Sequence, residues 1–207
     1  MYNLPHFTEH DSEKIFSFIK ENSFAVVAGF DEEYPVASHL PLEIIEENGK
    51  LIFTGHMMRK TSHHIAFEKN NNVLVIFQSP HAFITAAWYA NPSQASTVNY
   101  MAVHAKGKII FTDEAGTYAA IKQITDKHVG TDSAAVFNNL SEEYINTMLK
   151  AIVGFRIEVE SIKNVFKLSQ NKDDEDRKNI VDQLEKKGQY GTEFIANEMK
   201  KRLLYLF

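Results

Sequence analysis

The twelve residues from Phe53 to His64, FTGHMMRKTSHH, place much polar chemistry directly after an apolar run. They hold two adjacent cations, two threonines, a serine and three histidines. Two interpretations fit such a segment. It is either the solvated start of a helix or a site for an anion such as a phosphate.

The electrostatics of a helix start bear on both interpretations. If the apolar run is a strand and residues 59–70 open a helix, Arg59 and Lys60 lie where the helix dipole disfavours cations. A phosphate resolves this conflict, because it accepts from free backbone N–H groups, from the hydroxyls of Thr61 and Ser62, and from a guanidinium at two points. Cations that only point into water cost roughly a few tenths of a kcal/mol. The residues alone therefore leave both interpretations open.

The histidines of the same segment raise the question of a metal. His56, His63 and His64 would need a fourth ligand, for which His81 and Glu68 are the candidates. Neighbouring helix residues point roughly 100° apart, so His63 and His64 do not easily face one ion. No carboxylate–histidine spacing of a known zinc type is present. We therefore expect no metal site, and histidines that are exposed or adjacent to a cofactor.

Composition limits what kind of protein can carry this segment. With 207 residues and 44% hydrophobic content, the chain can bury the core of one domain. A net charge of -5 argues against a surface that coats DNA, because DNA affinity comes mainly from neutralised phosphates. The absence of cysteine excludes disulfides, thiolate metal sites and cysteine nucleophiles. No signal segment or membrane-spanning apolar run is recognisable, so we expect a cytoplasmic protein without a membrane partner.

Hydrophobic patterning predicts a chain dominated by strands. The expected strands cover residues 24–30, 34–45, 51–55, 71–78, 82–89, 98–112 and 152–169. Asn48-Gly49 fits a hairpin turn, since both residues tolerate positive φ. Gly107 is a candidate bulge or bend. Because short turns link most of the strands, we expect a closed or partly closed antiparallel barrel of about six strands, with flanking helices.

Helices are expected before, between and after these strands. Asp11 and Ser12 are N-cap candidates for the first helix. Two more are expected at residues 113–128 and 141–151. Gly188 and Gly191 are expected to divide the charged tail into two helices, whose apolar contacts are Ile180, Leu184, Phe194, Ile195, Met199 and Leu203.

Several stretches, taken together, resemble one known family. They are MYNLPHF at the start, ASHLPL (37–42), GHMMR (55–59), FQSPHAFI (77–84), WY (88–89), NYMAVHAKG (99–107), DKH (126–128), AIVGFRIEVESI (151–162) and FKLSQNKDDEDR (166–177). They span nearly the whole chain. On these stretches the chain resembles the PaiB family of FMN-binding negative transcriptional regulators. That family belongs to the FMN-binding split-barrel superfamily, together with pyridoxamine-phosphate oxidases, and Arg59-Lys60 resembles its phosphate-binding segment.

The sequence also departs from the family pattern. After GHM the family continues with a small residue, Arg and then Ala-Asn-Pro, whereas this chain has MRKTS at 58–62. The family's Ser-Pro-Ser before WY is replaced by residues 85–87 (TAA), and its Trp before NY is replaced by Val98. Val129 stands where a Glu usually follows DKH. We therefore expect a divergent member in which the 90–98 loop has altered contacts or an altered ligand.

The resemblance implies a fold and a cofactor site. It implies an FMN-binding split β-barrel of Greek-key type over residues 1–170, with a helical extension over 171–207 packed on the same domain. It also implies a homodimer that holds FMN at the subunit interface. The residues implied at the phosphate are Arg59, Lys60, Thr61 and Ser62. Those implied beneath or beside the flavin ring are Ser38, His39, Leu40, His56 and Gln78, and those that cover it or come from a second subunit are Trp88, Tyr100, Lys167 and Ser169.

The function implied by the resemblance is negative transcriptional regulation, and DNA binding is implied by the family alone. No helix-turn-helix is recognisable, and the basic stretch at 185–202 fits an amphipathic helix with a solvated face. The sequence contains no G-x-S-x-G, P-loop or G-x-G-x-x-G motif. No motif therefore supports a hydrolase, a nucleotide triphosphatase or a Rossmann-type dinucleotide-binding function. No residue stands out as an acid or base, so catalysis is undecided. A flavin-dependent oxidoreductase acting on an unknown small molecule is the alternative, followed by a flavin-free binding module.

Overall fold

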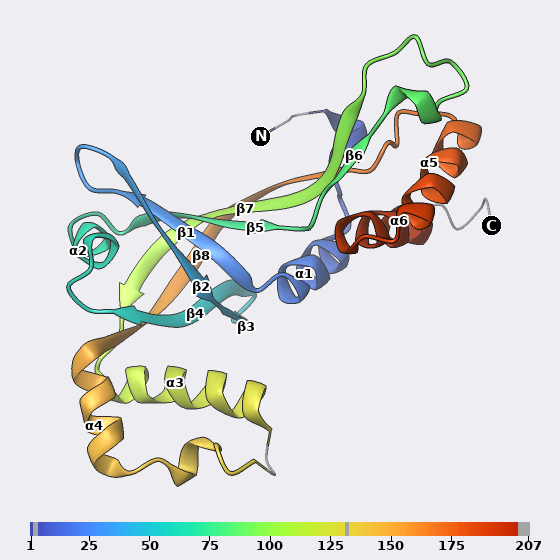
Figure 1. The fold of residues 1–207 in the computed structure, drawn as a ribbon. Coiled ribbons are helices and arrows are strands. Elements are labelled where there is room, and N and C mark those ends of the chain that lie inside the picture. Colours follow the sequence, from blue (N-terminus) through green and yellow to red (C-terminus); the bar gives the residue numbers. More distant parts are fainter. Residues whose placement is uncertain (2–3, 131–132, 203–207) are drawn as a thin grey trace. The chain divides into compact units, whose positions relative to one another are not determined.

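The computed structural model describes residue 1, residues 4–130 and residues 133–202 (Figure 1). Its strands are β1 (Phe24–Phe30), β2 (Pro35–Pro41), β3 (Glu43–Glu47), β4 (Lys50–Met58), β5 (Asn72–Gln78), β6 (Ala82–Ile84), β7 (Thr97–Phe111) and β8 (Ile152–Lys167). Its α-helices are α1 (Ser12–Glu21), α2 (Ser62–Lys69), α3 (Glu114–Val129), α4 (Glu142–Ala151), α5 (Asp174–Lys187) and α6 (Tyr190–Arg202). Three short 3-10 helices are η1 (Pro5–Phe7), η2 (Ala86–Trp88) and η3 (Phe137–Asn139).

Local sequence explains where most helices begin. Asp113, Ser141 and Asp173 each precede a helix, and each side chain accepts a backbone N–H from that helix's first turn. Gly188 ends α5 in the left-handed conformation, with φ at +58°, which glycine adopts without steric cost. The predicted helices at 113–128 and 141–151 are thus confirmed.

Some boundaries differ from the prediction. The expected strand at 34–45 is two strands, β2 and β3, so the sheet has eight strands and not about six. The expected strand at 82–89 ends at Ile84 and continues as η2. Gly191 does not separate α5 from α6 but lies inside α6, where a Cβ would meet the carbonyl oxygen of His81 at 2.6 Å. Leu203 lies outside the described residues.

The sheet order is β2-β1-β5-β7-β8-β4-β3, with β6 paired to β7. The pairs β1–β2, β1–β5, β3–β4 and β4–β8 are antiparallel. β2 and β3 form opposite edges of the sheet, yet Leu42 alone separates them in sequence. The two edges must therefore approach each other, and a Cβ on Gly55 of β4 would lie 3.2 Å from the carbonyl oxygen of Pro41 on β2. The sheet is accordingly an antiparallel, curled half-barrel.

The described chain divides into two compact units. Unit 1 comprises Met1–Ser17, Gln78–Val103 and Lys163–Phe207, and unit 2 comprises Phe18–Phe77 and His104–Ile162. The curled sheet of unit 2 buries Phe53 and Phe77 completely, with their rings edge to face at 5.1 Å. In unit 1, α5 and α6 bury a shared set of apolar side chains, which are Ile180, Val181, Leu184, Ile195, Ala196 and Met199.

Candidate functional site

The predicted cationic segment lies in unit 2, at the junction between β4 and α2. β4 ends at Met58 and α2 begins at Ser62, with Thr61 as the N-cap. The Thr61 hydroxyl oxygen accepts the backbone N–H of His64 at 3.4 Å. The predicted helix start is therefore confirmed, and Arg59 and Lys60 stand immediately before it.

The position of Arg59 is fixed by Ile152, the first residue of β8, and by Ala151, which precedes that strand. Its backbone N–H donates to the carbonyl oxygen of Ala151 at 2.9 Å, and its Nε donates to that of Ile152 at 2.8 Å. The side chain is half-buried. These bonds orient the guanidinium plane while its two terminal amino groups have no hydrogen-bond acceptor within the described residues. A planar, oriented guanidinium suits an oxyanion, which it can bind at two points.

Lys60 is exposed and adopts the left-handed backbone conformation, with φ at +63°. For a residue with a Cβ this conformation costs about 1 kcal/mol, and such strain persists only where the surroundings enforce it. The Thr61 hydroxyl donates to the Met58 carbonyl oxygen at 3.0 Å, which ties the strand end to the helix start across Lys60. The strained turn places Lys60 directly before Thr61, the N-cap of α2.

The N-terminus of α2 supplies hydrogen-bond donors. The first N–H groups of a helix have no intrahelical acceptor. The Thr61 hydroxyl oxygen accepts the backbone N–H of His64. The backbone N–H groups of Ser62 and His63 have no acceptor in the part of the chain that the structure describes. Two cations and two free amide donors therefore meet at one corner, which we call the β4–α2 corner (residues 59–63). This arrangement favours an anion.

The histidines around this corner differ in environment. Burial lowers the pKa of His56, whose Nδ1 is buried without a hydrogen-bond partner among the described residues. Burial, and then the neighbouring His64, lower the pKa of His63. His64 is buried against Phe111, with ring centroids 4.8 Å apart. Within the described ranges no group of three His, Asp or Glu side chains has the arrangement of a metal site.

The residues predicted on β2 lie on an edge strand of unit 2. Leu40 is buried, Ser38 is half-buried and His39 is exposed. All three pair with β1, opposite Ala25, Val27 and Val26 respectively. Because β2 is at the sheet edge, its backbone pairs with β1 on one side only.

The remaining predicted residues lie in unit 1. Gln78 is exposed, and Tyr100 is half-buried. Trp88 is half-buried and carries the ammonium of Lys187 4.8 Å from its ring centroid. Lys167 and Ser169 lie together at the end of β8. The Lys167 ammonium donates to the Thr97 hydroxyl, and the buried Ser169 hydroxyl pairs with Asn99.

Unit 1 also contains a pocket of about 480 Å³, in which two predicted residues meet others that were not predicted. Lys167 and Ser169 line it, together with Tyr89, Gln94 and Lys172. Lys172 lies in the stretch FKLSQNKDDEDR and Tyr89 in WY, so both were inside recognised segments. Their convergence depends on how β8, the loop before β7 and η1 pack, which no local pattern reveals.

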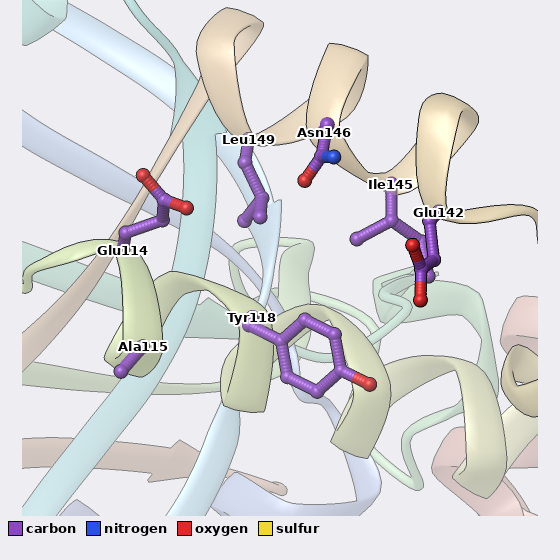
Figure 2. A pocket seen from close by; sticks show the side chains of 7 residues that line it. All are labelled: Glu114, Ala115, Tyr118, Glu142, Ile145, Asn146 and Leu149. Atoms are coloured by element: carbon purple, nitrogen blue, oxygen red, sulfur yellow. The ribbon is translucent and has the colours of Figure 1, made fainter.

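A larger pocket, of about 670 Å³, lies between α3 and α4 of unit 2 (Figure 2). Glu114 and Glu142, at the first positions of the two helices, line it with Tyr118, Ile145 and Leu149. Figure 2 shows the two carboxylates on opposite sides of the Tyr118 ring. None of the predicted site residues lines this pocket.

The cations of the C-terminal helices are largely neutralised. Arg177 pairs with Asp174, Lys200 pairs with Glu185, and Lys201 and Arg202 both pair with Glu198. Over residues 173–202, acidic side chains outnumber basic ones. Such a surface offers a DNA backbone little net attraction, which agrees with the solvated-helix interpretation. No helix in the described ranges has the length and apolar character needed to cross a bilayer.

Known proteins are similar to this chain in sequence or in fold. A family model described as "Putative FMN-binding domain" matches residues 1–161. The Bacillus subtilis "Protease synthase and sporulation protein PAI 2" is 34% identical over 206 residues, covering 98% of each chain. Among solved structures, the flavocytochrome Anf3 from Azotobacter vinelandii matches with a TM-score of 0.61 and 13% identity, over 85% of this chain and 77% of that one. The FAD and heme binding protein from Mycobacterium smegmatis matches with a TM-score of 0.57 and 14% identity, over 77% and 73%.

Proposed function

This chain belongs to the family described as "Putative FMN-binding domain" and is 34% identical to PAI 2, and we propose that it binds FMN with the phosphate at the β4–α2 corner. The observation that supports this most is the oriented Arg59 guanidinium, held by the Ile152 carbonyl oxygen at 2.8 Å, beside the N-terminus of α2. Two cations before a helix start are unfavourable without an anion between them and the free N–H groups. A phosphate monoester carries the required charge and acceptor oxygens.

Each group at the corner has a distinct part in holding the phosphate. Arg59 offers a bidentate contact, and Lys60 offers a point charge on a flexible stem. The N–H groups of Ser62 and His63 and the Ser62 hydroxyl provide neutral donors. His56 lies on β4, and its Nδ1, which is buried without a hydrogen-bond partner among the described residues, is proposed to bond to the cofactor. When bound, FMN supplies the redox chemistry, and the protein binds and orients it.

The rest of the proposed flavin site comes from the edge strand and a second subunit. In this proposal Ser38, His39 and Leu40 lie beneath the flavin ring and contact it through backbone groups of the edge strand. Gln78 lies beside the ring. The proposed homodimer contributes the residues that cover the ring, which are Trp88, Tyr100, Lys167 and Ser169. Large apolar side chains exposed on and after β1 support an interface: Phe24 is 68% exposed and Tyr34 is 66% exposed. Light scattering coupled to gel filtration tests the dimer, and a monomer at working concentration contradicts it.

The biological role proposed here is that of a PaiB-type negative regulator that carries a flavin. The relative's name connects that protein with protease synthesis and sporulation, and this chain aligns with nearly all of it. Because Lys200, Lys201 and Arg202 are paired with carboxylates, we do not assign DNA contact to α5 and α6. Electrophoretic mobility of promoter DNA at physiological salt tests the regulatory role directly. Binding that disappears at modest salt contradicts sequence-specific recognition.

The cofactor assignment has its own experiment. The purified protein should be yellow and should release FMN on denaturation, identified by chromatography. Arg59→Ala with Lys60→Ala should remove most of the bound FMN. A matched control is Lys50→Ala with Lys69→Ala, because these residues begin β4 and end α2 and the change in charge is the same. Retention of FMN by the first pair, or equal loss from both pairs, refutes the corner as the phosphate site.

A further inference from the structure

The pocket between α3 and α4, which we call the α3–α4 pocket, lies within unit 2 (Figure 2). α3 contributes residues from its first two turns, and α4 contributes one helix face, made of Glu142, Ile145, Asn146 and Leu149. The volume of about 670 Å³ is within the usual range for small-molecule sites. None of the residues proposed to hold FMN lines this pocket, so a ligand bound here would be a second one.

The wall of the α3–α4 pocket is apolar and aromatic. Leu149 is buried in a cluster with Ile121 and Phe137, and Ile145 packs against that cluster. The Tyr118 ring stands edge to face on Phe137, with ring centroids 5.1 Å apart. Tyr118 nevertheless remains 38% exposed. The packing against Phe137 therefore fixes the position of the ring and leaves part of it open to a ligand.

Two carboxylates flank this apolar wall. Glu114 is the first residue of α3 and Glu142 is the first residue of α4. Figure 2 shows them on opposite sides of the Tyr118 ring, with Leu149 toward Glu114. Neither carboxylate has an ion pair or a hydrogen bond to another side chain within the described residues. The helix dipole accounts for an acidic residue at each helix start, but it does not require both of them to line one pocket.

The lysines of α3 do not neutralise these carboxylates. Lys122 pairs with Asp126 at 2.6 Å, and its ammonium lies 5.6 Å from the Phe137 ring centroid. Lys127 pairs with Glu43 of β3 at 2.8 Å. No lysine, arginine or histidine of the described ranges lines the pocket. A concave site that combines negative charge with apolar surface attracts an organic cation.

We propose that the α3–α4 pocket binds an aliphatic diamine, with one ammonium group at each of the two carboxylates and the hydrocarbon chain along Tyr118 and Leu149. The stretch of α4 from Glu142 to Leu149 is roughly 10 Å long along the helix axis, which suits a chain of several methylene groups between two charges. The face of the Tyr118 ring adds attraction for an ammonium group, and the Asn146 side-chain oxygen is a further acceptor. A metal ion would need more oxygen ligands than two carboxylates provide, and would leave the apolar wall unused.

The test is calorimetric titration of the full-length protein, as purified and at low ionic strength, with 1,6-diaminohexane, hexylamine and 1,6-hexanediol. These probes share one chain length and differ in charge, because only their amino groups are protonated at neutral pH. We expect saturable binding of the diamine that weakens as salt is raised. Hexylamine should bind about three- to fivefold more weakly, because it forms one ion pair fewer. The diol should not bind.

Substitutions of the two carboxylates locate the binding. Glu114→Gln and Glu142→Gln should each weaken binding of 1,6-diaminohexane about three- to fivefold, because each removes one ion pair in a partly solvated site. The matched control is Glu143→Gln. Glu143 also lies in the first turn of α4 and is exposed, but it does not line the pocket, so its substitution should leave the affinity unchanged.

A second pair of variants keeps both carboxylates in place. Ala115 is exposed and lines the pocket, so Ala115→Lys should supply an ammonium group to the carboxylates and abolish diamine binding. Ala119→Lys is its control, since Ala119 is an exposed residue of α3 outside the lining. Thermal unfolding shows that each variant is folded.

Several results would overturn the proposal. They are no binding of the diamine, equal binding of the diamine and the diol, equal binding of the diamine and hexylamine, and diamine binding that survives both glutamate variants and Ala115→Lys. FMN content is measured in the same variants and should match that of the parent protein. If the glutamate variants lose FMN as the Arg59 and Lys60 double variant does, the α3–α4 pocket is not a separate site and the proposal is wrong, while the FMN proposal stands.

Discussion

Lys60 is the residue at which stability and cofactor binding should respond in opposite directions. Its φ of +63° is unfavourable for a side chain with a Cβ, and its ammonium is proposed to contact the FMN phosphate. Lys60→Gly removes both features. Lys60→Met removes the charge but keeps the Cβ and therefore the backbone strain. Comparison of the two variants separates the cost of the turn from the contribution of the charge.

The expected magnitudes follow from the geometry. Glycine has no Cβ and therefore avoids the steric cost of the left-handed conformation. The Lys60→Gly apoprotein should accordingly be about 1 kcal/mol more stable than the Lys60→Met apoprotein. Loss of a charge-assisted contact, about 1.5–3 kcal/mol, should raise the Kd for FMN about 10- to 100-fold in both variants. Urea denaturation of the apoprotein measures the first effect. Quenching of flavin fluorescence during titration measures the second.

A matched control is available in the hairpin between β3 and β4. Asn48 also has positive φ, at +53°, and is exposed. Asn48→Gly should stabilise the apoprotein by only roughly a few tenths of a kcal/mol, because asparagine tolerates this conformation, and it should leave FMN binding unchanged. If Lys60→Gly is no more stable than Lys60→Met, the strain argument is wrong. If both Lys60 variants bind FMN as tightly as the parent, Lys60 does not contact the phosphate.

Two further predictions concern unit 2. A Cβ on Gly107 would lie 2.3 Å from the Glu158 carbonyl oxygen, so Gly107→Ala must push β7 away from β8 and should cost about 2–4 kcal/mol of unfolding free energy in urea. A loss below about 0.5 kcal/mol contradicts that close approach. Burial lowers the pKa of His56, so the unfolded state binds its proton more readily, and stability should fall as the pH drops below about 6.5. His56→Gln should make the pH dependence between 7.5 and 5.5 shallower, and an unchanged slope in urea titrations at those pH values refutes the assignment.

Sequence patterns predicted the parts of the fold that depend on short-range effects. The helix starts at Asp113 and Ser141 follow from side chains that accept N–H groups three residues later. The division of residues 34–45 into two strands was missed because β-rich residues continue through the break. What divides them is the change of partner, since β2 pairs with β1 and β3 pairs with β4. Pairing across the sheet is not visible in the local alternation of side chains.

The sequence predicted which residues belong to the candidate site better than it predicted how these residues are arranged in space. The MRKTS segment was expected to combine cations with a helix start, and that combination depends only on residues next to one another. The attachment of Arg59 to Ile152, 93 residues away, was not predicted. Nor was the pocket of Lys172 and Tyr89, since each residue lies in a recognised stretch that has no chemical signal of its own.

By itself, the sequence determined the family, because matching stretches recur along nearly the whole chain. It also determined the cationic helix start and the absence of cysteine chemistry, because these depend on residue types and on neighbours within about one helical turn. Tertiary structure decided which carbonyl oxygen orients Arg59, which residues must be glycine so that β7 and β8 can approach, and which lysines share a pocket. These contacts join segments separated by tens of residues, and their geometry exists only once the sheet has curled and the helices have packed.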